Sequence, residues 1–279
     1  MPEDEITHDR RAGAVFMCGP LAGVSGGDVH ALRLVREWNK RAPGSAALIA
    51  PLSVRDAAPV GDDDFVAVRT PLDRWLRGLA TYAAVVALRS VVAPVIAPRA
   101  RFAVAASHFV QDVVPVALHR LRYRSQPVVY VYHLVADMER APGLRSRLSL
   151  AAERLSVALI RLVGAIVFVD NDKTLRSLEA RGLPRRRLVP TRNAYDPMNP
   201  LPPRAESDKP VVAFLGRFTE EKGIWDMLEL ARALAERAPA ARIEMLGAGP
   251  LLREYGERVE RAGLSNVEVR GFVDEEAKW

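Results

Sequence analysis

The stretch PVVAFLGRFTEEKGIWDMLELARAL, residues 210–234, holds the clearest strand-to-helix transition in the sequence. Residues 210–216 form a continuous apolar run, which is typical of a parallel strand covered on both faces. The apolar side chains that follow recur at helical spacing, at Ile224, Leu228, Ala231 and Leu234. A short loop with one Arg and one Lys, Arg217 and Lys222, therefore connects a buried strand to an amphipathic helix.

The same transition repeats along the chain. Other short, continuous apolar runs occur at 14–18, 46–50, 65–68, 101–106, 127–132, 165–169, 241–247 and 266–272. Helical patterns lie between most of these runs, and strands that alternate with helices are typical of a parallel sheet with helices on both faces. The sequence therefore predicts an α/β, doubly wound, Rossmann-like fold.

A proline-rich segment divides the predicted elements into two groups. Residues 196–208, DPMNPLPPRAESD, hold four prolines and no apolar periodicity, as in a stiff interdomain linker. We therefore predict a first Rossmann-like domain over 1–195, a linker over 196–208 and a second domain over 209–279. The second has room for three strands and two helices, which is half of a doubly wound domain.

Composition limits the class of protein. The chain has 279 residues, of which 49% are hydrophobic, enough for a sizeable core. Cys18 is the single cysteine, which excludes an internal disulfide and a multi-cysteine zinc site and favours a reducing cytoplasm. The polar N-terminus lacks the apolar region of a signal peptide, and no apolar run reaches the roughly 18 residues that span a bilayer. We expect a cytoplasmic protein without a bound metal.

The charge is unevenly distributed. Residues 1–207 hold 29 Lys and Arg against 20 Asp and Glu, whereas residues 208–279 hold 11 against 14. A basic first part favours an anionic partner such as lipid head groups, nucleic acid or a phosphorylated substrate. Because the arginines are scattered at helical positions, without interleaved aromatic residues or zinc-finger spacing, we do not expect nucleic-acid binding.

Two loops are candidates for binding an anion. Arg217 and Lys222 follow the first strand of the second domain, where two cations and a helix N-terminus could converge on one anion. Gly26 and Gly27 follow the first strand of the first domain, where glycine lets the backbone approach a phosphate. An ordinary solvated turn explains the first loop equally well, and an ordinary tight turn explains the second.

Two further features fall at the carboxyl ends of predicted strands, where such folds bind ligands. His133 ends the run PVVYVYH, and an imidazole there could donate to a hydroxyl or an oxyanion. A histidine paired with neighbouring backbone is the simpler interpretation. Gly247 and Gly249 follow the second strand of the second domain and would permit close approach of a ligand.

The order of these motifs resembles glycosyltransferase family 4, the retaining group with the GT-B fold. The second domain has G-R-x4-K-G at 216–223, then L-G-x-G-P at 246–250, then V-x-x-x-G-F-V at 267–273. The first domain contributes a Gly-Gly loop after its first strand and a histidine at the end of a middle strand. Where the family has an Asn-Gly pair, this sequence has Asn193 followed by alanine.

The resemblance implies a GT-B-like fold that transfers a sugar from a nucleotide-sugar donor to an acceptor with retention of configuration. Arg217, Lys222 and the backbone of Gly26 and Gly27 would hold the donor diphosphate. The remaining implied roles are catalysis for His133, nucleotide binding for Gly216, Gly247 and Gly249, and an interdomain or donor contact for Asn193. Because cations stabilise the leaving diphosphate, neither metal nor cofactor is implied.

The acceptor and the activity of this chain are less closely defined. The basic charge and the apolar, basic segment 72–101 favour a carbohydrate or glycolipid acceptor of the cell envelope, reached by peripheral docking on the anionic inner face of the plasma membrane. The sequence ends before the family's downstream Glu-x7-Glu stretch, which favours a truncated chain that could be inactive alone. Another GT-B protein, such as a sugar-nucleotide epimerase, is the alternative.

Overall fold

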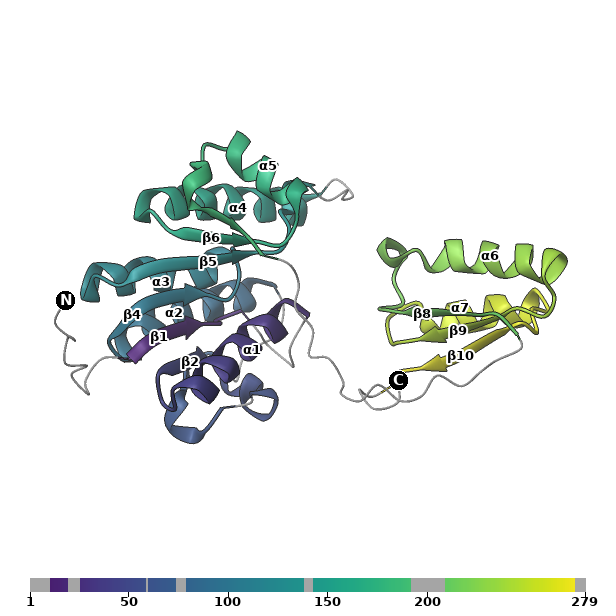
Figure 1. The fold of residues 1–279 in the computed structure, drawn as a ribbon, viewed down its shortest axis with the longest axis horizontal. Helices are drawn as coiled ribbons and strands as arrows, with labels where there is room; N and C mark the ends of the chain where they lie inside the picture. The colour runs from purple at the N-terminus through teal and green to yellow at the C-terminus, as the bar shows by residue number, and fades with distance from the viewer. Residues whose placement is uncertain are drawn as a thin grey trace. The chain divides into compact units, whose positions relative to one another are not determined.

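The computed structural model of the chain describes residues 11–19, 26–58, 60–73, 79–137, 143–191 and 209–273. The chain forms two compact units, Met1–Ala194 and Tyr195–Trp279 (Figure 1). The predicted linker over 196–208 and the candidate residue Asn193 lie outside the described residues. Each unit is an α/β layer structure, as the alternation of apolar runs and helical patterns predicted.

The first unit is built on a seven-stranded sheet of order β3-β2-β1-β4-β5-β6-β7, in which every neighbouring pair is parallel. The strands are β1 (Arg11–Phe16), β2 (Ala46–Ala50), β3 (Phe65–Ala67), β4 (Ala100–Ala105), β5 (Gln126–Val131), β6 (Ile166–Val169) and β7 (Leu188–Pro190). The order reverses direction at β1 and β4, as in a doubly wound fold, and the carboxyl ends of those strands are where such folds place ligands.

The predicted strands of this sheet are confirmed, with bounds within a few residues. The run 46–50 coincides with β2, in which all five residues are buried, as expected of a strand covered on both faces. β7 was not predicted, because it has only three residues and ends in a proline. A proline is tolerated there because β7 is the edge strand and its outer side forms no ladder.

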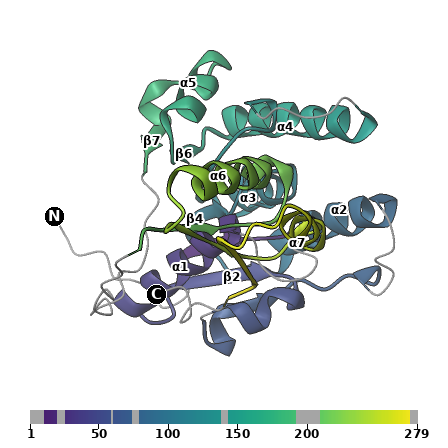
Figure 2. The same ribbon diagram turned by 90° about the vertical axis from the view of Figure 1, so that its right-hand side faces the viewer.

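Two apolar layers cover the sheet. One contains Ala14 and Phe16 of β1 together with side chains of α2 (Leu79–Ile96), α3 (Val110–Tyr123) and α4 (Leu144–Val163). The other contains Val15 of β1 and the buried face of α1 (Gly26–Arg41). Alternate residues of β1 thus enter opposite layers. Figure 2 shows α2, α3 and α4 together on one side of the sheet, away from α1.

Two polar side chains favour the starts of helices in the first unit. Asn171 caps α5 (Asp172–Ala180) by accepting from the Thr174 backbone N–H at 2.8 Å. Asp28 lies within the first turn of α1. An acidic residue in that turn favours the helix, because the positive end of the helix dipole lies there.

The second unit has a three-stranded parallel sheet of order β10-β9-β8. Its strands are β8 (Val211–Leu215), β9 (Arg242–Leu246) and β10 (Val267–Gly271), and its helices are α6 (Ile224–Arg237) and α7 (Leu252–Arg261). The core contains Phe218, Ile224, Leu228, Met245 and Tyr255. Ile224, Leu228 and Ala231 are buried, so the predicted apolar face of α6 is confirmed.

Candidate functional site

The loop after β8 is tied to the loop after β9. The Gly216 N–H donates to the Leu246 carbonyl at 3.0 Å, and the Phe218 N–H donates to the Ala248 carbonyl at 3.0 Å. The Phe218 side chain is fully buried, with its ring edge-on to that of Tyr255 at 5.6 Å. Because Phe218 points into the core, the preceding residue, Arg217, is exposed at the carboxyl edge of the sheet.

Lys222 lies at the other end of this loop. It is the last residue of the 3-10 turn η6 (Glu220–Lys222), and Gly223 then starts α6 with a φ of +74°. Glycine suits this position because the left-handed region costs it little. Lys222 is therefore exposed directly before a helix N-terminus, at the same end of the strand as Arg217.

The two cations have no close partner among the described residues. Neither Arg217 nor Lys222 forms an ion pair or a side-chain hydrogen bond within the part of the chain that the structure describes. Hydrogen bonds to the Glu221 carboxylate, from its own backbone N–H and from Thr219, lower its pKa, and the charges of Arg217 and Lys222 add to that effect. This arrangement can accept an anion without first breaking a salt bridge.

Gly247 and Gly249 are required by the packing of the loops on one another. Gly247 has a φ of +138°, and a Cβ there would lie 1.8 Å from the Gly216 carbonyl oxygen. A Cβ on Gly249 would lie 2.5 Å from the Phe218 carbonyl oxygen. Gly216, Gly247 and Gly249 therefore meet beside Arg217. The glycines that the sequence suggested for close approach of a ligand allow the backbones of the two loops to approach each other.

In the first unit, His133 follows β5 by two residues and is exposed. Its ring lies 6.3 Å from that of His108, at an interplanar angle of 75°. His108 follows β4 and is buried, and its carbonyl accepts a hydrogen bond from the Ser156 hydroxyl. Two histidines from neighbouring strands thus meet at the carboxyl edge of the sheet.

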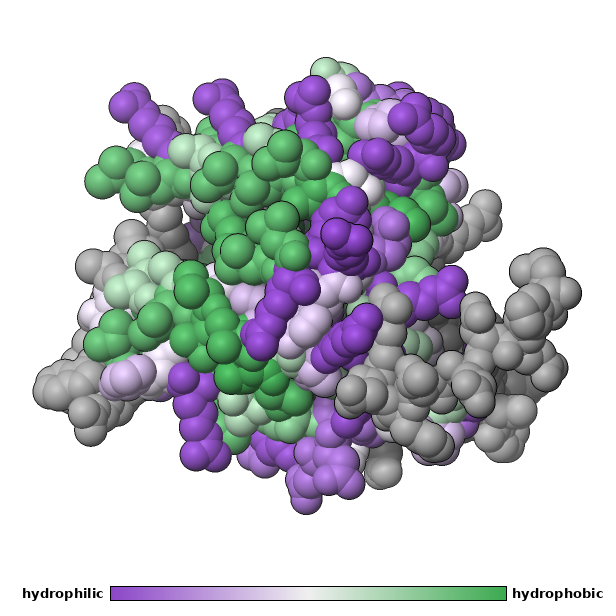
Figure 3. All heavy atoms as spheres, turned by 90° about the vertical axis from the view of Figure 1, so that its left-hand side faces the viewer, coloured by the Kyte–Doolittle hydropathy of each residue, from purple (hydrophilic) through white to green (hydrophobic). Residues whose placement is uncertain are grey.

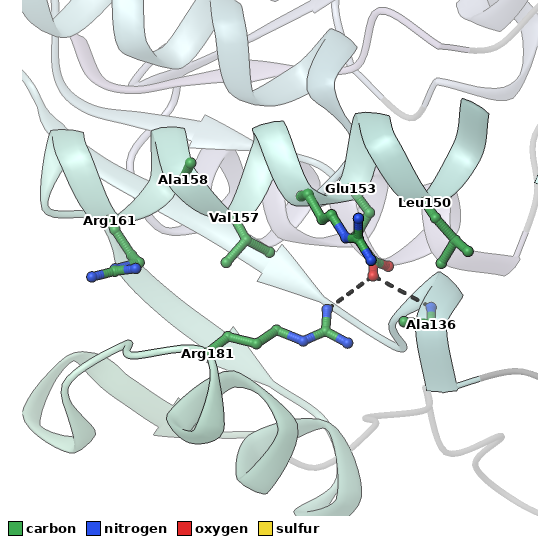
Figure 4. Close-up of a pocket in the computed structure, with 8 residues that line it drawn as sticks. Ala136, Leu150, Glu153, Val157, Ala158, Arg161 and Arg181 are labelled. Carbon is green, nitrogen blue, oxygen red and sulfur yellow. Dashed lines mark hydrogen bonds and ion pairs between the residues drawn. The ribbon is translucent and has the colours of Figure 1, made fainter. Parts of the chain in front are cut away.

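A buried carboxylate, Glu153, lies beside this pair. Its Oε2 atom is 3.4 Å from His108 Nε2, and its Oε1 atom accepts from Arg181 Nη1 at 2.9 Å. Figure 4 shows Arg181 and the Ala136 amide converging on Glu153 at one end of a pocket of about 370 Å³ along α4. Burial alone raises the pKa of a carboxyl group, but the contacts from His108, Arg181 and the Val135 N–H lower the pKa of Glu153 to about 2.

A second buried carboxylate holds the chain that follows β1. Asp112, in the first turn of α3, accepts from the Cys18 N–H at 2.7 Å and from Ser107 Oγ at 2.6 Å. Burial raises the pKa of Asp112 to about 7, although these two hydrogen bonds act in the opposite direction. No sequence motif indicated this role, because Asp112 lies far along the chain from Cys18.

Gly26 and Gly27 are the first two residues of α1, so they belong to the helix and not to a loop before it. Further along α1, the His30 ring stacks on that of Tyr132 at 5.3 Å. Burial and the charge of Arg33 lower the pKa of His30, whereas Asp170 raises it. The start of α1 thus lies at the same carboxyl edge as Tyr132 and His133.

These features define an α/β protein of the GT-B type, with candidate residues at the carboxyl edges of two Rossmann-like sheets. Residues 201–279 match the family model described as "Glycosyl transferases group 1". No curated protein matches the sequence. Among the described helices, none combines the length and the apolar character needed to cross a membrane. Nor do the described residues contain a cluster of three metal-ligating side chains.

Solved structures show the same fold at low sequence identity. HepE of Anabaena, in complex with UDP and glucose, is 15% identical, with a TM-score of 0.62 over 95% of this chain and 70% of that one. WaaG, a glycosyltransferase involved in lipopolysaccharide biosynthesis, is 14% identical, with a TM-score of 0.60 over 95% of this chain and 71% of that one. The UDP-GlcNAc 2-epimerase of Methanocaldococcus jannaschii is 8% identical, with a TM-score of 0.54 over 95% of this chain and 74% of that one.

Proposed function

We propose that the protein is a glycosyltransferase that moves a sugar from a nucleotide-sugar donor to an acceptor with retention of configuration. The observation that supports this most is the pair Arg217 and Lys222, two exposed cations without an ion-pair partner among the described residues. Both lie in the loop between β8 and α6, inside the segment that matches the glycosyl transferase group 1 model. Enzymes of this fold bind ligands at that edge of the sheet.

In this proposal, Arg217 and Lys222 hold the donor diphosphate. Negative charge develops on the diphosphate as the bond to the sugar breaks, so fixed cations lower the barrier without a metal or a cofactor. The Gly216, Gly247 and Gly249 backbone would lie next to the nucleotide, and the amides at the start of α1, at Gly26 and Gly27, would approach the diphosphate. His133, exposed after β5, would contact the reacting sugar or the acceptor.

We infer that the acceptor is a carbohydrate or a glycolipid of the cell envelope. The net positive charge of residues 1–207 supports a cytoplasmic protein that docks peripherally on an anionic membrane. HepE was solved with UDP and glucose, which supports a uridine nucleotide as the first donor to test.

Calorimetric titration of the full chain with UDP, GDP and ADP tests the phosphate contact. Arg217→Ala and Lys222→Ala should each weaken the binding of the preferred diphosphate by about tenfold or more, since each removes a charge-assisted contact. Arg237→Ala, which removes an exposed arginine from the end of α6, should leave the affinity unchanged. Unchanged affinity in both site variants would remove Arg217 and Lys222 from the diphosphate site.

The main alternative is a sugar-nucleotide epimerase, which the structural likeness to the Methanocaldococcus jannaschii enzyme supports. NMR of a sugar nucleotide incubated with the protein separates the two. A transferase releases the nucleoside diphosphate and, when an acceptor is present, forms a product whose anomeric configuration equals that of the donor. An epimerase forms a second sugar nucleotide and releases no diphosphate. Tight diphosphate binding with neither product would favour an inactive transferase.

A further inference from the structure

One side of the first unit is unusually apolar. Three side chains on the outer surfaces of α2, α3 and α4 show the extent of this exposure: Val95 is 62% exposed, Leu121 79% and Leu162 82%. Helices on a protein surface ordinarily present polar side chains to water. The other large aliphatic side chains that are exposed on the described parts of these helices are Val91, Ile96, Leu144, Leu148 and Leu155. We call this surface the α2–α4 face.

Helix α4 carries the longest part of this face. Its exposed apolar residues follow a spacing of four and three residues, namely Leu144, Leu148, Ala151, Leu155, Ala158 and Leu162. The apolar stripe therefore runs the full length of α4, from the carboxyl edge of the sheet to its amino edge. Beside it, a column of exposed arginines repeats once per heptad, at Arg147, Arg154 and Arg161.

The α2–α4 face is hollowed between two of its helices. A groove of about 490 Å³ lies between α3 and α4 and is lined almost entirely by aliphatic side chains. Leu121 and Leu162 stand at this groove, and Arg120 is its one charged lining residue. The apolar surface thus continues from α4 onto α3.

The charges on the face have one sign. The only acidic residues in α2, α3 and α4 are Asp112 and Glu153, and both are buried, at 3% and 2% exposure. Asp112 accepts a hydrogen bond from the Cys18 N–H, and Glu153 accepts one from Arg181. The charged side chains of these helices that reach the surface are arginines, and Arg122 lies at the end of α3 beside Val95, whose carbonyl accepts from it at 2.9 Å. Figure 3 shows apolar side chains gathered on this side of the unit with hydrophilic ones around them.

We propose that the α2–α4 face is a docking surface for an anionic lipid membrane. This inference rests on the proposed function and names the surface through which the transferase docks. The face is too broad for one partner helix, since it spans three helices, and a bilayer interface covers such a width. A second copy of the chain fits poorly, because self-pairing along α4 would bring the arginine columns together. Anionic head groups complement the arginines, and the aliphatic side chains reach the acyl region.

The α2–α4 face is not the surface that the sequence predicted for membrane docking. Segment 72–101 was expected to dock, but Arg89 of that segment is buried and forms an ion pair with Asp73 at 2.9 Å. Only the outer side chains of α2, such as Val91 and Val95, contribute to the face. Helices α3 and α4 supply the rest.

Co-sedimentation with vesicles tests the docking surface. The full chain is mixed at low salt with vesicles of phosphatidylcholine, with and without phosphatidylglycerol, because salt screens such contacts. We expect binding to the anionic vesicles only. The double variant Leu155→Gln/Leu162→Gln should bind the anionic vesicles more weakly, by about tenfold or more. The triple variant Arg147→Gln/Arg154→Gln/Arg161→Gln should lose about a hundredfold.

Matched controls remove equal numbers of similar groups elsewhere. Leu52→Gln/Leu230→Gln removes two exposed leucines outside the face, and Arg41→Gln/Arg69→Gln/Arg176→Gln removes the same net charge. Both controls should bind anionic vesicles like the parent protein. Equal losses in the controls, or no vesicle binding by the parent at low salt, would overturn the proposal.

Two further measurements separate the remaining outcomes. Light scattering that finds a dimer in the parent and a monomer in Leu155→Gln/Leu162→Gln would assign the face to a second copy and overturn membrane docking. Calorimetry with UDP, GDP or ADP should give the same affinity in the face variants as in the parent. A chain that binds anionic vesicles through this face but binds none of these diphosphates would keep the docking surface and reject the transferase.

Discussion

At position 249 a methyl group has no room, because its carbon would lie 2.5 Å from the Phe218 carbonyl oxygen and 2.7 Å from the Phe218 nitrogen. Both atoms are backbone, so relief requires one loop to move. Gly256 of α7 offers the opposite case, since a Cβ there would have open space. The fold therefore requires glycine at position 249 but not at position 256.

Gly249→Ala should therefore destabilise the second unit by about 2 kcal/mol or more, through displacement of the loop after β8. Gly256→Ala should stabilise it by about 0.5–1 kcal/mol, since alanine is the better helix former. Chemical denaturation followed by the fluorescence of Trp225, in α6, measures both. An unchanged midpoint in Gly249→Ala would show that the loops do not pack as described.

The contribution of Glu153 to the free energy of unfolding should depend on pH. Its folded pKa, about 2, is below the ordinary value of 4.5, so its contribution to stability is present above the ordinary pKa and is lost as pH falls through the folded value. Glu153→Gln should cost about 2 kcal/mol at neutral pH. The difference from the parent should shrink between pH 4.5 and about pH 2. Urea unfolding of both proteins across that range measures it, and a constant difference would contradict the role of the charge.

At the scale of elements, Asn171 joins two strand ends to a helix. Its side-chain oxygen caps α5 through Thr174, and its Nδ2 atom donates to the Tyr132 carbonyl at 2.9 Å, immediately before His133. The carboxyl ends of β5 and β6 are thereby tied together. The cap is a local contact, three residues apart in the sequence, whereas the bond to Tyr132 depends on strand pairing.

Asn171→Ala should lower the free energy of unfolding by about 1 kcal/mol or more, because it removes the cap and the bond to Tyr132. Asn171→Ser keeps an acceptor for the Thr174 N–H but loses the donations to Tyr132 and Asp170 and adds no charge beside Asp170, so its loss should be smaller. Denaturant titration of the two variants checks the order. Equal losses would mean that the cap contributes nothing separate from the strand contact.

At the scale of the whole molecule, the diphosphate contacts proposed for each unit predict which amides a bound ligand should protect. Hydrogen exchange of the full chain with its preferred nucleoside diphosphate tests this. Amides of 216–223 and 247–250 should exchange more slowly, by up to about a hundredfold at a ligand concentration of about 100 Kd. The first residues of α1, beginning at Gly26, should also be protected. Protection that omits the second unit would contradict the assignment of Arg217 and Lys222.

The layer structure and the order of the elements follow from local patterns in the sequence. Short continuous apolar runs such as 46–50 predict buried parallel strands, and their period and length are local properties of the chain. The placement of Arg217 and Lys222 at a strand's carboxyl end was also local, since five positions separate them. The short edge strand β7 was missed because three residues carry too little pattern.

Which distant residues meet depends on how the chain folds. His108 and His133, Glu153 and Arg181, and Cys18 and Asp112 come together through the pairing of strands and the packing of helices, which no local pattern encodes. The outward direction of Leu121, Leu155 and Leu162 was likewise invisible, because an apolar residue in a helix is ordinarily expected in the core. Burial and exposure depend on what covers a side chain, and that is a property of the folded molecule.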